Sequence, residues 1–143
     1  MAGFAFIRWN VSVSSNPVIA ILDDEPQLRK ALRRLLVAHG FAVVTFERSE
    51  DLLAALEAQP MDCLLLDLYM PGTDGYRVLE SIAARRLTTP VILITGHGEA
   101  QTAREVMGLG AAAYLDKPVD EAELLSAING AMDFRSSVRH PFS

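Results

Sequence analysis

The sequence predicts an α/β fold in which five strands and five helices alternate along the chain. Several short apolar runs have no polar face, which is typical of strands buried on both sides in a parallel sheet. Segments with apolar residues at helical spacing separate these runs. Because connections between neighbouring parallel strands are right-handed in nearly all proteins, we expect a doubly wound (βα)5 sheet with helices on both faces.

The first half of the chain contains two strand–helix units. Residues 18–22 form the first strand, and Pro26 opens a helix with an apolar stripe made of Leu28, Leu32, Leu35 and Leu36. Residues 42–46 form the second strand. We expect Ser49 to cap the helix that follows, which stops near Pro60.

The second half continues the same alternation. The expected strands are residues 63–67, 91–95 and 113–115. We also expect three helices: one that starts at Asp74 or Gly75, one that ends at Gly108, and one that starts after Asp120. Asp120 is followed three residues later by Glu123, which is the spacing of a capping box. The last ten residues are expected to be an unstructured tail.

Composition sets limits on the class of protein. The 143 residues are 50% hydrophobic and 22% charged, as in a single globular domain. A net charge of −5 argues against nucleic acid as a direct partner. No apolar stretch approaches the roughly 20 residues that span a bilayer. The single cysteine, Cys63, cannot form an internal disulfide, which fits a cytoplasmic protein.

We expect three segments: an extension at 1–16, the domain at 17–134 and a tail at 135–143. Within the extension, apolar and polar residues alternate from Ile7 to Val13, which is typical of a half-buried strand. If ordered, this strand would lie against a sheet edge or another subunit, since Trp9 has no other evident way to leave water. A disordered extension, or a true start codon further downstream, are the alternatives.

Carboxylates follow two strands that are neighbours in the doubly wound order 2-1-3-4-5. Asp23 and Asp24 come after the first strand, and Asp67 ends the third. The crevice between these two strands is where such sheets bind ligands, so we expect the three carboxylates to converge there. Their mutual repulsion favours a bound cation, and oxygen ligands in a small site favour Mg²⁺.

Three further groups follow the fourth and fifth strands. Thr95 supplies a hydroxyl, Gly96 a backbone amide and Lys117 an ammonium group. Together they could hold the oxygens of a phosphoryl group over Asp67. A carboxylate nucleophile facing these donors predicts a site that accepts a phosphoryl group.

On these motifs the sequence resembles the CheY-like receiver domain of two-component response regulators, a flavodoxin-like fold. The resemblance covers Pro17 to Phe134 and rests on Asp23-Asp24, the segment from Asp67 to Gly75, Thr95, Tyr114 and Lys117-Pro118. The loop Thr95-Gly96-His97-Gly98 is similar to that of FixJ-type transcriptional regulators. Those proteins continue into a DNA-binding domain, for which this chain is too short.

The resemblance implies that Asp67 accepts phosphate from the phosphohistidine of a sensor histidine kinase. It also implies that Asp23, Asp24 and Asp67, with the backbone carbonyl of Tyr69, hold Mg²⁺. The chain would then be a phosphoacceptor with at most slow self-dephosphorylation, and not an enzyme.

The resemblance further implies that Lys117 pairs with the acyl phosphate and that the Lys117–Pro118 peptide bond is cis. We expect a switch that runs from Thr95 to Tyr114. It would alter the surface of the fourth helix, last strand and fifth helix, through which a target protein or a second copy would bind.

Two alternatives stay open. An aspartyl-phosphate phosphatase of the haloacid dehalogenase type would have a similar site, but it needs a second aspartate two residues after the nucleophile, where this chain has Tyr69. A pseudo-receiver would bind partners without phosphorylation, although no site residue is missing here.

Overall fold

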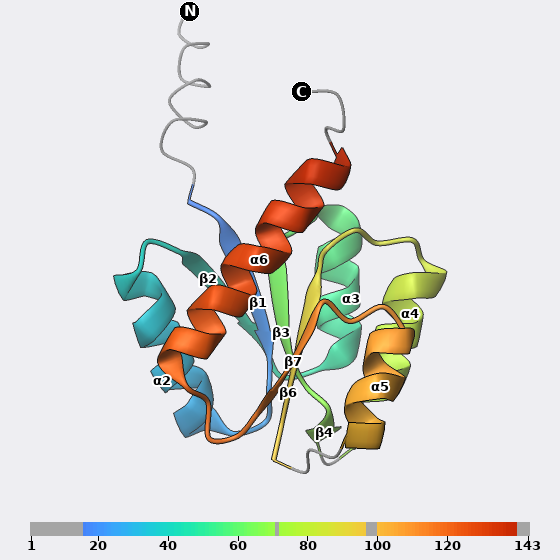
Figure 1. Cartoon of the computed structure of the whole chain (residues 1–143), viewed down its shortest axis with the longest axis horizontal. Helices are drawn as coiled ribbons and strands as arrows, with labels where there is room; N and C mark the ends of the chain where they lie inside the picture. The colour runs from blue at the N-terminus through green and yellow to red at the C-terminus, as the bar shows by residue number, and fades with distance from the viewer. Residues whose placement is uncertain (1–15, 71, 97–99, 140–143) are drawn as a thin grey trace, which may run out of the picture.

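A computed structural model describes residues 16–70, 72–96 and 100–139, and these residues contain a five-stranded parallel sheet (Figure 1). Its strands are β1 (Val18–Leu22), β2 (Ala42–Phe46), β3 (Cys63–Asp67), β6 (Val91–Thr95) and β7 (Ala113–Asp116). They are ordered β2-β1-β3-β6-β7. This is the predicted order 2-1-3-4-5, because β6 and β7 are the fourth and fifth strands of this sheet.

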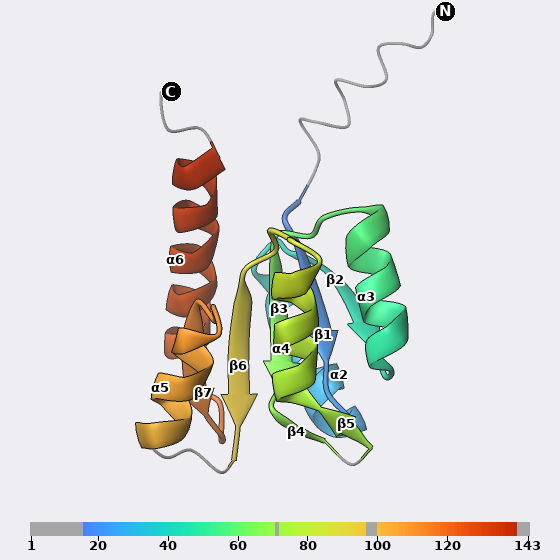
Figure 2. The same ribbon diagram turned by 90° about the vertical axis from the view of Figure 1, so that its right-hand side faces the viewer.

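Helices cover both faces of the sheet, as predicted, and the two views show the layers (Figures 1 and 2). The helices are α2 (Pro26–Ala38), α3 (Ser49–Ala58), α4 (Gly75–Ala84), α5 (Ala100–Gly108) and α6 (Glu121–Arg139). Residues of α2 and α6 share one hydrophobic core, and residues of α3, α4 and α5 share the other. Within the described ranges, none of these helices is long and apolar enough to cross a membrane.

The central strand β3 explains why its sequence has no polar face. All five of its residues are buried, with Leu64 and Leu66 in one core and Cys63 and Leu65 in the other. Burial raises the pKa of the Cys63 thiol to about 12. The thiol therefore stays protonated at neutral pH and packs as a small hydrophobic group.

The helix starts agree with the sequence in three of four cases. Pro26 lies in the first turn of α2, the Asp74 carboxylate accepts the Tyr76 amide at 2.9 Å, and the Asp120 carboxylate accepts the Glu123 amide at 2.9 Å. The predicted Ser49 cap is wrong by one residue: Ser49 is already helical, and Arg48 is the N-cap without a side-chain hydrogen bond.

The carboxyl terminus also differs from the expectation. Helix α6 continues to Arg139, so residues 135–139 are helical and do not form part of an unstructured tail. The segment 140–143 lies outside the described residues, as does the alternating segment at 7–13.

A two-stranded hairpin between β3 and α4 was not predicted. Strand β4 (Tyr69–Met70) pairs antiparallel with β5 (Thr73–Asp74), which returns the chain to β3. There the Gly75 amide donates to the Leu68 carbonyl at 3.1 Å. A Cβ atom built on Gly75 would lie 2.6 Å from both the Cα and the carbonyl oxygen of Leu68. Only glycine fits at this point, and it places α4 directly behind the end of β3.

We expect Gly75→Ala to lower the free energy of unfolding by about 1–3 kcal/mol, because the added methyl group must displace backbone next to Asp67. Urea denaturation would measure this. Gly108→Ala is the matched control, since a Cβ atom there meets none of the described residues within 4 Å; it should leave stability unchanged or raise it. Equal stability of the two variants would contradict the close-approach argument.

Candidate functional site

Asp67 is the last residue of β3, and its side chain is 4% exposed. The amide of Leu68 donates to the Ile94 carbonyl of β6, which keeps the chain in the sheet for one residue beyond Asp67. The amide of Tyr69 donates to Asp67 Oδ1 at 3.2 Å. The carboxylate is thus held at the carboxyl edge of the sheet in one orientation, with Oδ2 left for other partners.

Asp23 follows β1 directly and is also buried. Its Oδ1 accepts the amide of Glu25 at 2.8 Å, and its backbone carbonyl accepts Arg29 Nη1 at 2.6 Å. These bonds tie the β1–α2 turn to the first turns of α2. They hold the Asp23 carboxylate at the end of β1, the strand that lies next to β3 in the sheet.

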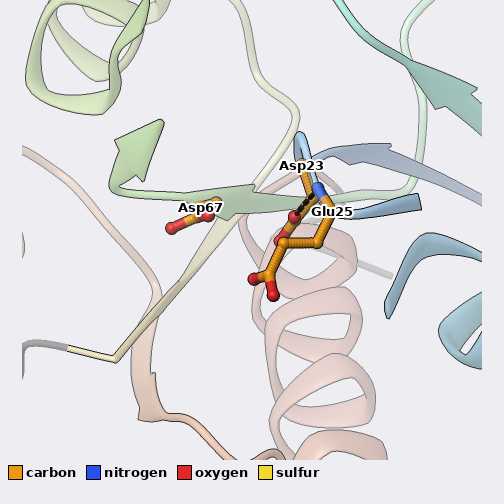
Figure 3. Close-up of side chains that lie close together, drawn as sticks. All are labelled: Asp23, Glu25 and Asp67. Atoms are coloured by element: carbon orange, nitrogen blue, oxygen red, sulfur yellow. Dashed lines mark hydrogen bonds between the residues drawn. The ribbon is translucent and has the colours of Figure 1, made fainter. Parts of the chain in front are cut away.

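The structure gathers three carboxylates into one cluster (Figure 3). Ligand oxygens of Asp23, Glu25 and Asp67 lie within 4.8 Å of one another, and this is a group that could hold a metal ion. Asp23 and Asp67 were predicted for this place. Glu25 was not, and Asp24, which was predicted, is exposed and is not a member of the cluster.

Lys117 reaches all three carboxylates from the residue after β7. Its Nζ atom lies 3.1 Å from Asp67 Oδ2, 3.5 Å from Asp23 Oδ2 and 2.5 Å from Glu25 Oε1. The Lys117 amide donates to the Thr95 carbonyl at 2.9 Å, which anchors its backbone to β6. The Lys117–Pro118 peptide bond is cis, so this prediction is confirmed.

Among the described residues, the cluster holds more negative charge than the Lys117 ammonium group balances. Burial is the main cause that raises the pKa of Asp67 above its ordinary value, against the opposing effect of Lys117. Burial likewise raises the pKa of Asp23. Burial acts to lower the pKa of Lys117, but its hydrogen bonds to Glu25 and Asp67, together with the charges of Asp23 and Asp67, outweigh burial and raise it. A hard divalent cation would relieve this imbalance, and the oxygen-only donor set fits one.

Thr95 and Tyr114 lie on the same face of the sheet. Thr95 ends β6, is fully buried, and follows Leu93 by two residues, so both side chains point to the same side. Tyr114 is the register partner of Leu93 and packs against the core that contains Leu93. Gly96 follows Thr95, and a Cβ atom built on it would contact the Lys117 side chain at 4.0 Å. His97 and Gly98 lie outside the described residues.

Tyr69 belongs to a contact that the sequence did not predict. Its ring meets Tyr76 edge to face, with 6.4 Å between ring centres, and the Tyr76 hydroxyl donates to Glu105 at 3.3 Å. Burial and the neighbouring Tyr69 raise the pKa of Tyr76 to about 12. Tyr69 itself is 44% exposed. The chain from the end of β3 is therefore linked through α4 to α5.

The arrangement is suited to covalent attack by a carboxylate. Asp67 lies close to an ammonium group that could balance a second anion, and the nearby acidic side chains could bind a cation. Carboxylates in such surroundings act as nucleophiles toward phosphoryl groups.

A family model described as the response regulator receiver domain matches residues 19–129. Among curated proteins, the chain is 35% identical over 114 residues to the transcriptional regulatory protein FixJ of Bradyrhizobium diazoefficiens, an alignment that covers 80% of this chain and 56% of FixJ. It is 34% identical over 124 residues to the DNA-binding transcriptional regulator NtrC of Salmonella typhimurium, covering 87% of this chain and 26% of NtrC. The chain thus spans about half of FixJ and about a quarter of NtrC.

Solved structures agree with the fold. The crystal structure of FixJ-N superposes with a TM-score of 0.76 at 33% identity, covering 83% of this chain and 95% of that one. A response regulator receiver domain protein from Clostridium thermocellum superposes with a TM-score of 0.78 at 31% identity, covering 85% and 98%.

Proposed function

The chain belongs to the response regulator receiver domain family of two-component phosphorelays, and we propose that Asp67 is the residue on which it accepts the phosphoryl group. The observation that carries this proposal is the position of Asp67 Oδ2, which lies 3.1 Å from Lys117 Nζ at the carboxyl end of the central strand. The donor would be the phosphohistidine of a sensor histidine kinase.

In the proposed reaction, a carboxylate oxygen of Asp67 attacks phosphorus and the phosphorus–nitrogen bond of the phosphohistidine breaks. The imidazole nitrogen leaves with the electron pair of that bond and takes up a proton. Lys117 binds an oxygen of the transferred group, and the Thr95 hydroxyl and the Gly96 amide donate to the others. The product is an acyl phosphate on Asp67.

We propose Mg²⁺ as the metal. Asp23 and Asp67 of the acidic cluster would hold it, together with Asp24 and the backbone carbonyl of Tyr69, which follow them in the sequence; Glu25 lies in the same cluster. When bound, the ion would neutralise negative charge that otherwise repels an incoming phosphoryl group. The raised pKa values of Asp23 and Asp67 support this proposal, because they reflect carboxylates that lack full compensation.

Intact-mass analysis after incubation with acetyl phosphate tests the proposal. We expect one added phosphoryl group per chain when Mg²⁺ is present and none when a chelator removes it. Uptake that is independent of divalent cations would contradict the metal-assisted site.

Mg²⁺ should also stabilise the folded state, by about 2.7 kcal/mol at a hundredfold excess over its dissociation constant, and should therefore raise the melting temperature. Asp23→Asn should reduce this effect, because it removes a buried carboxylate of the cluster. The matched control Asp51→Asn, on exposed α3 surface, should not. An unchanged melting temperature at saturating Mg²⁺ would argue against a preformed site.

The chain would act as a phosphoacceptor with at most slow self-dephosphorylation. A phosphatase of the dehalogenase type needs an acid/base aspartate at position 69, and Tyr69 cannot supply it. We take residues 17–134 as the receiver domain and 1–16 and 135–143 as flanking segments. A cytoplasmic location agrees with the buried, reduced Cys63.

We further propose that phosphorylation moves the Thr95 hydroxyl toward Asp67 and lets the Tyr114 ring follow on the same face of the sheet. A phosphoryl group adds roughly 1.5 to 2 negative charges and new acceptor oxygens beside Thr95. The shift would change the surface formed by α5, β7 and α6, where a target protein or a second copy would bind.

Thr95→Ala should leave phosphorylation of Asp67 largely intact but weaken the dimerisation or target binding that phosphorylation induces. Sedimentation velocity with and without acetyl phosphate would measure this. Thr45→Ala, an exposed threonine on β2, is the control and should respond like the parent. A normal response of both Thr95→Ala and Tyr114→Ala would exclude this route.

A further inference from the structure

An apolar groove lies at the amino-terminal end of the strands, opposite the end that carries Asp67. Its volume is about 1120 Å³. It is bordered by α4, the start of β6, the α5–β7 connection and α6, and its lining includes Leu79, Ile82, Val91, Leu109, Ala112 and Gly130. This volume is as large as that of pockets that hold small-molecule ligands, so the groove can receive several side chains.

The groove is open because small residues border it. Ala112 and Gly130 line it and are exposed, and a Cβ atom built on Gly130 would meet no atom of the described part of the chain within 4 Å. Leu79, Ile82 and Val91 also line the groove, and these aliphatic side chains are buried. An apolar segment that entered the groove would remove its own apolar side chains and the exposed apolar atoms of the rim from water.

The chain carries a segment that matches the groove in chemistry. In residues 7–13, which lie outside the described residues, the apolar residues Ile7, Trp9, Val11 and Val13 alternate with polar ones. A strand with this pattern presents one apolar face and one polar face. These residues lie outside the part of the chain that the family model matches, which starts at residue 19.

The segment joins the domain beside the groove. Val18 opens β1, and its amide donates to Asp62 Oδ2 at 2.7 Å. The adjoining residue Met61 exchanges two hydrogen bonds with Thr89, which lines the groove. The amino end of β1 and the carboxyl-terminal half of α6 lie at the same end of the molecule (Figures 1 and 2).

The distance is within reach of the chain. From β1 to β7 there are three strand spacings of about 4.8 Å, or roughly 14 Å in all. Residues 10–16, which separate Trp9 from Pro17, span roughly 23 Å when extended, at about 3.3 Å per residue. Trp9 can therefore enter the groove of its own chain. The short tether also gives this segment a high effective concentration there.

We propose that the apolar face of residues 7–13, with Trp9 as its main contact, docks into this groove of the same chain. The inference is independent of phosphorylation, because it uses no residue of the Asp67 site. A second copy of the chain is the other candidate occupant, and the test below separates the two.

Trp9 is the only tryptophan, so its fluorescence reports on this segment alone. In the full chain we expect a blue-shifted emission that is protected from acrylamide quenching and independent of protein concentration. Gly130→Leu fills the groove and favours the helix, so the fold should persist. It should shift Trp9 emission to that of a solvent-exposed tryptophan. Gly108→Leu is the matched control, because it adds the same side chain to an open position that does not line the groove.

Three results would overturn the proposal. One is solvent-like emission from Trp9 in the parent chain. Another is protection that appears only as protein concentration rises and a dimer forms. The third is protection that survives both Gly130→Leu and Gly130→Phe while circular dichroism shows that the variants are folded.

As a second measurement, benzoylphenylalanine at position 9 should crosslink within its own chain to peptides that contain residues 79–91 or 109–131.

Discussion

Asp67→Asn should abolish phosphoryl uptake from acetyl phosphate, as measured by intact mass. Asparagine keeps the shape of the side chain but has no carboxylate to attack phosphorus. The fold should persist, because the substitution removes a buried charge. Burial raises the pKa of Asp67 from its ordinary value of 3.8, so its ionised form is disfavoured in the folded state. The melting temperature at neutral pH should accordingly equal or exceed that of the parent.

Asp116→Asn is the matched control for this substitution. Asp116 ends β7 as Asp67 ends β3, but it is exposed and is not a member of the acidic cluster. It should take up phosphate like the parent. Phosphate uptake by Asp67→Asn at the parent rate would show that another residue is the acceptor.

The sheet could be predicted from sequence because burial on both faces leaves a clear pattern. The residues of β3 and β6 are all buried, and each strand is apolar up to the polar residue that ends it, Asp67 or Thr95, because neither has a solvent side. The β4–β5 hairpin could not be predicted, since strands of two residues are too short to show a period. The helical residues at 135–139 were missed because the apolar stripe of α6 weakens after Met132.

The candidate site was predicted in part for a related reason. Asp23, Asp67 and Lys117 follow strands that are close in the sheet, so the strand order alone brings them together. Glu25 was missed because three acidic residues follow β1 in succession, and the sequence cannot tell which of them turn toward β3. The extended backbone at the α2 N-cap, together with the bond from the Glu25 amide to Asp23, decides this.

Lys117→Ala should lower both phosphoryl uptake and stability. Within the described parts of the chain, Lys117 is the cation that contacts all three carboxylates of the cluster. Without it, Asp23 and Asp67 remain buried with no ammonium partner. Hydrogen bonds to charged groups contribute about 1.5–3 kcal/mol each, and the partial exposure of Lys117 reduces the loss, so we expect about 2 kcal/mol by urea unfolding at neutral pH. Lys30→Ala, at an exposed position on α2, is the control and should change stability little.

The destabilisation by Lys117→Ala should depend on pH and on Mg²⁺. A carboxyl group whose folded-state pKa is raised contributes stability that is fully present below its unfolded pKa and is lost as pH rises through the folded value. In the variant this loss is larger, because Lys117 no longer opposes the effect of burial on Asp23 and Asp67. The stability difference from the parent should therefore be greatest at neutral pH and should shrink as the pH falls through the raised pKa values.

Saturating Mg²⁺ at neutral pH should recover part of the lost stability, since it replaces the missing positive charge. A difference that is constant with pH and insensitive to Mg²⁺ would mean that Lys117 acts through packing and not through charge.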